Sequence, residues 1–314
     1  MARRLDTPRS LSPVDLLSLL YLGAVWGAVF LFMRVSAPEV GPVWAAEIRL
    51  AIGAVVLAAL AGGSTLAAAR GRIRDFVVVG ALFSAIPFTL IAFATLTLPA
   101  GLTALLNAAT PLFTALVGAA FLGQRIVPRV AAGLFVGMIA VVPLVGWSPL
   151  EPSSTLVLAV AAGLGAPASY AVAGNFVRAR LGDVPPLELA TGMVVGGAVL
   201  ALPVAVLSGP PGVPSIDGVV SLVLVGTVST ALAWPVFFRV LRRTTVTAAS
   251  TVTFVVPAFA LAWASLALAE PVGIGLLGGF GLILVSLVLV LGIGPSLSLR
   301  VAGGRRWLAA GARP

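Results

Sequence analysis

The stretch Thr103–Arg125, TALLNAATPLFTALVGAAFLGQR, decides the fold, because a second copy of its pattern occurs at Ala249–Pro271. Each copy is an apolar run long enough to cross a bilayer, with a proline (Pro111 or Pro257) in its middle. A phenylalanine follows each proline two residues later, and a glutamine or glutamate follows it thirteen residues later. A shift of 146 residues superimposes the copies, which predicts a chain built from two related halves.

The composition is that of an integral membrane protein. The 314 residues are 60% hydrophobic and 9% charged, with a mean hydropathy of +1.15. Soluble domains carry about 25% charged residues, so this chain cannot cover an ordinary water-facing surface. Its apolar runs of about 20 residues instead fit the thickness of a bilayer.

Three residue types are missing from the sequence: cysteine, histidine and, since all 19 basic residues are arginine, lysine. Their absence removes disulfides, thiol nucleophiles, the commonest metal ligand, the usual general base and the lysine of ATP-binding loops. We therefore expect no catalysis, no metal and no cofactor. The net charge of +9 lies in small arginine clusters between apolar runs, which argues against a nucleic-acid surface.

The sequence predicts an all-α membrane protein with ten transmembrane helices in two five-helix repeats, 15–147 and 155–293, followed by a cytoplasmic tail, 294–314. Arg3-Arg4 permits a twin-arginine reading, but the next apolar run lacks a small-residue cleavage site, so we expect it to be a retained first span. The expected spans are 15–34, 44–63, 76–95, 100–122 and 128–147, then 155–178, 187–207, 217–238, 246–268 and 272–293.

Arginine placement predicts the orientation. Seventeen of the 19 arginines fall in the two tails and in the loops after the even-numbered spans, so both termini should be cytoplasmic. Five spans is an odd number, so the halves must enter the membrane in opposite directions. This inverted-topology repeat is a recurring scheme of secondary transporters.

Four prolines lie inside matched spans of the two halves: Pro87, Pro111, Pro235 and Pro257. Proline removes a backbone hydrogen bond, which lipid does not replace. A central cavity lined by these spans would explain the paired placement, whereas the alternative is that prolines are common in membrane helices.

Polar residues form a stripe on one face of the fourth span, and a shorter stripe in the ninth has Thr253 where the first half has Asn107. The stripes either line a solute site or join packed helices, and the Asn107 amide is the best suited to grip a solute. The first stripe consists of Thr103, Asn107, Thr110 and Thr114.

Aromatic residues away from the membrane ends are candidates for a binding wall: Trp26 and Phe30 in the first span, Tyr170 in the sixth and Trp234 in the eighth. Aromatic walls with a few hydrogen-bonding groups suit a small amphiphilic metabolite. Tyr170 would need a partner for its hydroxyl.

Glu47 and Arg49 are the charges lying well within a span, and a charge at the bilayer centre costs roughly 2.5–3.5 kcal/mol. Two residues apart on a helix, they are poorly placed to pair with each other. Arg49 either binds an anionic group of a substrate or braces a neighbouring helix. Glu47 is the leading candidate for a proton-coupling carboxylate.

The fifth span of each half carries glycines four residues apart, Gly133/Gly137 and Gly275/Gly279. Small residues at this spacing form helix-packing surfaces. We expect these spans to support the fold or a homodimer.

The order of these motifs resembles ten-span EamA-type drug/metabolite transporters from about Leu16 to Leu291. The features are Trp26-Gly27, Pro42 followed by Arg49, the Pro111 run ending in Gly123-Gln124-Arg125, and Pro257 to Glu270. The family usually has glutamate where this chain has Gln124, so an amide replaces a charge there. The resemblance implies a secondary carrier of the bacterial inner membrane with a binding cavity between its halves.

We therefore expect an alternating-access exporter of small metabolites, with amino acids the favoured class and coupling to protons or to exchange. Its partners would be a small-molecule substrate and the lipid bilayer. Two alternatives are a membrane scaffold or sensor without transport and a membrane-embedded enzyme, against which the missing histidine, cysteine and lysine argue.

Overall fold

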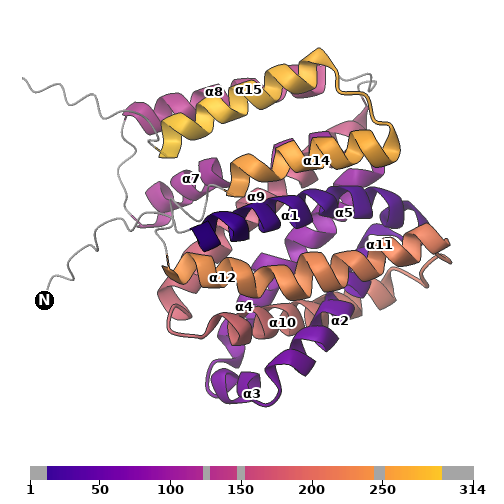
Figure 1. The fold of residues 1–314 in the computed structure, drawn as a ribbon, viewed down its shortest axis with the longest axis vertical. Coiled ribbons are helices and arrows are strands. Elements are labelled where there is room, and N and C mark those ends of the chain that lie inside the picture. Colours follow the sequence, from indigo (N-terminus) through magenta and orange to yellow (C-terminus); the bar gives the residue numbers. More distant parts are fainter. Residues whose placement is uncertain (1–12, 123–127, 147–152, 244–251, 292–314) are drawn as a thin grey trace, which may run out of the picture.

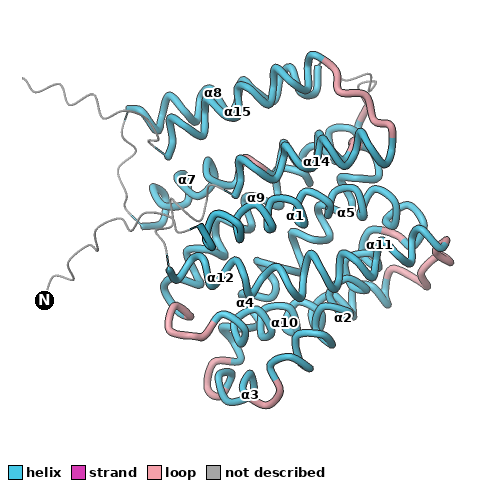
Figure 2. Tube along the Cα trace, viewed as in Figure 1, coloured by secondary structure: helices cyan, strands magenta, loops and turns pink. Residues whose placement is uncertain are grey.

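The computed structural model describes residues 13–122, 128–146, 153–243 and 252–291, and every regular element in these ranges is a helix (Figures 1 and 2). In chain order the helices are α1 (Pro13–Val40), α2 (Pro42–Ala61), α3 (Ser64–Ala69), α4 (Ile73–Gly80), the π-helix η1 (Ala81–Ala85), α5 (Ile86–Thr97), α6 (Ala100–Asn107), α7 (Thr110–Leu122), α8 (Pro128–Gly146), α9 (Ser154–Arg180), α10 (Pro186–Leu207), α11 (Ile216–Gly226), the π-helix η2 (Thr227–Leu232), α12 (Ala233–Arg243), α14 (Val252–Leu268) and α15 (Ile274–Leu291).

Helical segments of membrane length account for the predicted spans. Within the described ranges, seven segments of 20 to 28 residues are long and apolar enough to cross a bilayer. The remaining three predicted spans correspond to α8, α14 and α15. Large apolar side chains such as Val55, Phe135 and Leu266 are exposed on the outside, which suits contact with lipid rather than water. The chain is a multi-pass membrane protein.

Short polar and cyclic residues set several helix starts. Pro42 and Pro186 begin α2 and α10, where a missing backbone N–H costs nothing. The hydroxyl oxygens of Ser153 and Ser215 each accept a hydrogen bond from the backbone N–H three residues later, which caps α9 and α11. The helices therefore begin close to the predicted boundaries, although α1 continues six residues beyond its predicted end at position 34.

The helix contacts repeat when each element is exchanged for its counterpart in the other half. α2 packs on α10 and α8 packs on α15, so these two pairs lie across the symmetry axis. α1, the first span of one half, packs on α14, the fourth span of the other. In the same way, α9, the first span of the second half, packs on α6 and α7, which form the fourth span of the first. Likewise, α5 packs on α9, while α11 and α12 pack on α1. This reciprocity, with five spans per half, is the arrangement of two inverted five-helix repeats.

The two π-helices lie at the same register of the repeats, because η1 begins at Ala81 and η2 begins 146 residues later at Thr227. A π-helix inserts an extra residue into a turn and locally disturbs the hydrogen-bond ladder. Pro87 and Pro235 follow shortly after the two segments. The sequence pointed to these prolines as sites where the helices are interrupted, but it did not predict the π-helices before them.

Glycines allow α2 and α10 to cross these segments at very short range. A Cβ on Gly53 of α2 would lie 3.3 Å from the Gly226 carbonyl oxygen and 2.9 Å from Thr230 Cγ2. A Cβ on Gly197 of α10 would lie 3.2 Å from the Gly80 carbonyl oxygen and 2.7 Å from Ser84 Cβ. The two crossings are equivalent, since Gly80 and Ser84 become Gly226 and Thr230 after the 146-residue shift.

The pair α8 and α15 lies side by side at one edge of the bundle, at the top of Figure 1. Gly133 and Gly137 of α8 are buried, and the Ser286 hydroxyl of α15 donates to the Gly133 carbonyl oxygen at 2.6 Å. The predicted small-residue surface of the fifth span therefore packs within the chain, against its repeat counterpart.

The crossing glycines can be tested with Gly80→Ala, which would place a methyl group 2.5 Å from the backbone nitrogen of Gly197. Because a backbone atom, unlike a side chain, cannot rotate away from the new methyl group, we expect the free energy of unfolding to fall by roughly 1–3 kcal/mol. Thermal melting of the purified protein in detergent measures this. Gly174→Ala is the control, since nothing lies within 4 Å of its Cβ position and alanine favours a helix. Equal melting temperatures for the two variants would contradict the close crossing.

Candidate functional site

Arg49 is 2% exposed and is buried at the contact between the two halves. Its Nε–H donates to the Thr230 hydroxyl oxygen at 2.8 Å, which joins α2 of the first half to η2 of the second. The Thr230 hydroxyl in turn donates to the Val225 carbonyl oxygen, five residues earlier, at 2.7 Å. The π-helical turn therefore orients the hydroxyl so that one lone pair faces the guanidinium.

The face of the same guanidinium rests on an aromatic ring, with its central carbon 3.5 Å from the centre of the Phe88 ring. Such a cation–π contact stabilises a desolvated arginine by about 2 kcal/mol. One terminal nitrogen, Nη1, is buried without a hydrogen-bond partner in the described protein.

Six aromatic residues, here called the aromatic cluster, gather next to this arginine from both halves of the chain. Trp26 lies 5.0 Å from Trp234 between ring centres, and Phe83 lies 5.1 Å from Trp234 and 5.6 Å from Tyr170. These tilted and edge-to-face contacts are the favourable geometries for aromatic pairs. The members are Trp26, Phe83, Tyr170, Trp234, Phe237 and Phe238.

Two reciprocal hydrogen bonds hold Trp26 in place. Its indole N–H donates to the Ser229 carbonyl oxygen at 3.2 Å, and the Ser229 hydroxyl donates to the Val25 carbonyl oxygen at 2.8 Å. The indole nitrogen of Trp234, whose residue is 5% exposed, has no partner in the described protein. The aromatic cluster thus contains a hydrogen-bond donor that has no partner among the described residues, one helical turn after the Thr230 that bonds to Arg49.

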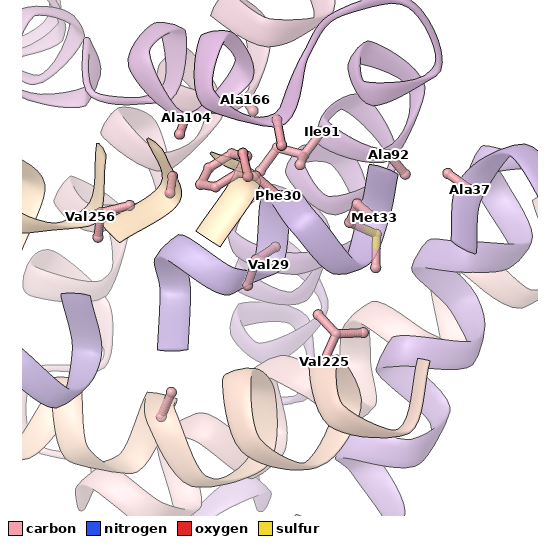
Figure 3. Close-up of a cluster of buried hydrophobic side chains, with 14 of the residues drawn as sticks. Val29, Phe30, Met33, Ala37, Ile91, Ala92, Ala104, Ala166, Val225 and Val256 are labelled. Atoms are coloured by element: carbon pink, nitrogen blue, oxygen red, sulfur yellow. The ribbon is translucent and has the colours of Figure 1, made fainter. Parts of the chain in front are cut away.

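Other predicted site residues lie elsewhere. Phe30 is buried in the apolar core formed by α1 with other helices, and Figure 3 shows its ring beside Ile91 and Ala166. Trp26, Tyr170 and Trp234 are brought together, and Trp26 and Tyr170 also pack against the core that contains Phe30. Thr253 belongs to α14, but its side chain lies outside the described residues, as does Gln124.

Asn107 and Thr110 flank a break between α6 and α7, where a single kinked span was predicted. Pro111 cannot donate to the Asn107 carbonyl oxygen four residues earlier, and the Thr110 hydroxyl supplies that bond at 2.8 Å. Thr103 and Thr114 likewise donate to carbonyl oxygens of their own helix. The hydroxyls of the stripe therefore donate to nearby backbone carbonyl oxygens. The Asn107 side-chain oxygen, in contrast, is buried without a partner among the described residues.

Pro257 remains inside a continuous helix. It lies within α14, where α1 approaches closely: a Cβ on Gly27 would lie 2.8 Å from the backbone nitrogen of Ala260 and 3.0 Å from the Val256 carbonyl oxygen. The indole N–H of Trp263 also donates to the Ala24 carbonyl oxygen of α1 at 3.0 Å. The proline thus belongs to a tight helix–helix contact rather than to a visible break.

Glu47 is buried on α2, 5% exposed, and one of its carboxylate oxygens has no partner in the described protein. It stands about 200° around the helix from Arg49, as expected for residues two positions apart. The two charges therefore do not neutralise each other.

Ion pairs tie the helix ends together on opposite sides of the bundle. On one side, Glu270 lies 4.0 Å from Arg34 and accepts a 3.1 Å hydrogen bond from the Ala100 backbone N–H at the start of α6. On the other, Arg72 pairs with Asp183 at 2.8 Å and Arg180 pairs with Asp75 at 3.2 Å. Two of the arginine-bearing loops predicted to share one face, those of Arg72 and Arg180, therefore meet, while the side of the membrane on which they lie stays a prediction.

The Arg72–Asp183 pair is exposed to solvent. The hydrogen bond from Arg72 lowers the pKa of the Asp183 carboxyl. Stability from this pair is therefore present above the ordinary aspartate pKa and is lost as pH falls through the lowered value. Exposed pairs of this kind contribute little, so we regard the pair as a weak contact.

Sequence reasoning missed Phe83, Phe88 and Thr230. The repeat register contains part of the missing signal, because a shift of 146 residues pairs Phe88 with Trp234 and Ser84 with Thr230. Applying that register beyond the two quoted stretches would have marked Phe88 and Thr230 as the repeat equivalents of Trp234 and Ser84. Nothing in the pattern marks Phe83.

The bond from Arg49 can be tested with Thr230→Val, which keeps the side-chain shape and removes the acceptor. A buried hydrogen bond to a charged group contributes roughly 1.5–3 kcal/mol, and we expect a loss of that size in thermal or denaturant unfolding. Thr227→Val is the control on the same π-helix, because that hydroxyl donates only to the Val223 carbonyl oxygen one turn away. A similar loss in both variants would show that Arg49 gains nothing from Thr230.

Comparisons with known proteins agree with this architecture. A model of the EamA-like transporter family matches residues 15–146 and again residues 157–292. An uncharacterized transporter of Archaeoglobus fulgidus is 22% identical over 272 residues, covering 84% of this chain and 94% of the relative. A probable terminal-alkyne amino-acid exporter of Streptantibioticus cattleyicolor is 28% identical over 262 residues, covering 81% and 86%.

A solved crystal structure, described without a function, superimposes with a TM-score of 0.64 at 18% identity and covers 88% of this chain and 96% of its own. That likeness concerns the fold. The two family matches together span most of the sequence, one in each half. The chain therefore belongs to the EamA-like transporter family.

Proposed function

We propose that this transporter is a secondary carrier that exports small amphiphilic metabolites by alternating access, with amino acids the favoured class. The observation that carries the proposal is the group formed by Arg49 and the aromatic cluster at the junction of the repeats. It offers apolar ring surface together with two buried N–H groups, at Arg49 Nη1 and Trp234 Nε1, that have no partner in the part of the chain that the structure describes. Binding sites for small molecules combine these features.

The inverted repeat supports alternating access. Two halves with the same fold and opposite direction can exchange conformations, so that a central site opens first to one side and then to the other. The π-helices η1 and η2, each followed by a proline, lie at equivalent places and supply bending points in both halves. The Arg34–Glu270 contact and the Arg72–Asp183 pair would then alternate as contacts that close the two sides.

The direction and substrate class draw on the relatives. The Streptantibioticus cattleyicolor relative is described as a probable amino-acid exporter, and the aromatic cluster suits a substrate with an apolar side chain. We propose that both termini lie in the cytoplasm of a bacterial cell and the helices in its inner membrane, because 17 of the 19 arginines fall in the tails and in the loops after the even-numbered spans. Proton coupling and a homodimer stay predictions.

The proposal is tested with the purified full-length protein in proteoliposomes, using a panel of amino acids with and without an imposed proton gradient. We expect saturable flux of at least one apolar or aromatic amino acid. Trp26→Ala should raise KM by about 2- to 10-fold, which corresponds to losing an aromatic contact of roughly 0.5–1.5 kcal/mol.

Trp44→Ala is the matched control for that variant, because Trp44 donates to the Gly209 carbonyl oxygen at a helix end, away from the aromatic cluster. Its KM should stay close to that of the parent protein. Flux for no member of the panel would favour a scaffold or sensor over a carrier. Equal KM changes for the two tryptophans would remove Trp26 from the site.

Glu47 is the proposed proton-coupling carboxylate, because it is buried and one of its oxygens has no described partner. Glu47→Gln keeps the shape and cannot ionise. We expect this variant to retain exchange of labelled for unlabelled substrate and to lose the acceleration of net flux by a pH gradient. Glu188→Gln, in the first turn of α10, is the control. Undiminished stimulation in Glu47→Gln would exclude Glu47 from coupling.

A further inference from the structure

Arg49 is placed in a way that bracing alone does not explain. A guanidinium has five N–H donors, and the described protein satisfies Arg49 through Nε and through its face, while Nη1 is buried without a partner. Within residues 13–122, 128–146, 153–243 and 252–291, no carboxylate lies within ion-pair distance of it. A buried charge without a counter-charge is costly, so an additional anion would be strongly favoured there.

The equivalent crossing in the other half shows that the fold does not require this charge. Pro42 and Gly53 of α2 correspond to Pro186 and Gly197 of α10, a shift of 144 residues. The same shift takes Arg49 to Met193, which is fully buried. An apolar side chain therefore suffices where α10 crosses η1, and the cation in α2 serves an additional purpose.

We propose that Arg49 binds the carboxylate of the transported substrate, an inference that rests on the proposed carrier function. Phe88 fixes the plane of the guanidinium, and Thr230 fixes its Nε edge. The planar fork is thereby prepared for a carboxylate, which accepts two parallel hydrogen bonds from an arginine.

The surroundings of Arg49 define the rest of the ligand. The ring contacts run from Tyr170 through Phe83 to Trp234, which lies one helical turn after the Thr230 that bonds to Arg49. An apolar or aromatic side chain can pack against these rings while the carboxylate meets Arg49. Among the described residues, Glu47 is the other buried charge on α2, and it lies on a different face.

The substrate class that follows is a small monocarboxylate with one apolar side chain, recognised mainly through its carboxylate. Apolar amino acids belong to this class, and so do their N-acetyl derivatives. Amides of the same amino acids, which lack the anionic group, do not. Recognition through the amine would predict the opposite selectivity.

The test measures binding to the purified full-length carrier and flux in proteoliposomes for phenylalanine, N-acetylphenylalanine and phenylalanine amide. In the parent protein, we expect the two carboxylates to bind about 10- to 100-fold more tightly than the amide, as for the loss of a charged hydrogen bond. In Arg49→Met, which copies the residue of the other repeat, this preference should disappear. Arg49→Lys should retain part of it.

Arg239→Met is the control, because it removes an exposed arginine of α12 by the same substitution. Its selectivity should match that of the parent. Equal binding of acid and amide by the parent protein overturns the inference without any variant, as does an unchanged preference in a folded Arg49→Met protein. Transport of amines or amides alone would overturn the role of Arg49 and leave the carrier function standing, whereas absence of flux for these compounds and for the whole amino-acid panel would remove the carrier function itself.

Discussion

The crossing of each repeat's second helix over the π-helical segment of the other repeat is the contact on which the rest of the structure depends. At both crossings, glycine lies against glycine backbone: Gly53 against Gly226, and Gly197 against Gly80. Small residues are what allow membrane helices to approach so closely, because association in lipid relies on packing rather than on the hydrophobic effect. Arg49 and the aromatic cluster gather beside one of these crossings, so its geometry fixes the candidate site.

The lipid surroundings also explain how polar groups are distributed. In lipid, backbone groups freed by a proline or a π-turn need an internal partner. Thr110 supplies one for the carbonyl oxygen left free by Pro111, and Thr230 supplies one for Val225. Hydroxyls used in this way are part of the scaffold. The unpartnered groups of Arg49 and Trp234 differ from them, since no backbone defect accounts for their position.

The sequence alone predicted the helical class and the two repeats, since both depend on long apolar runs and on their order. It also predicted that Arg49 would brace a helix or bind an anion, and the structure shows the bracing contacts. The break before Pro111 and the π-helices were not predictable, because apolar periodicity does not register one extra residue in a turn.

Repeat symmetry finally separates scaffold from site. The crossing glycines, the π-helices and the packed fifth helices recur in both halves, as an alternating mechanism requires of the parts that exchange roles. A substrate is not symmetric, so the residues that bind it need not recur in both repeats. In the other repeat, the position equivalent to Arg49 is occupied by Met193. The position equivalent to Glu47 is occupied by Thr191, whose hydroxyl donates to its own helix. Charge is thus placed in one repeat only, at positions where the other shows that the fold works without it.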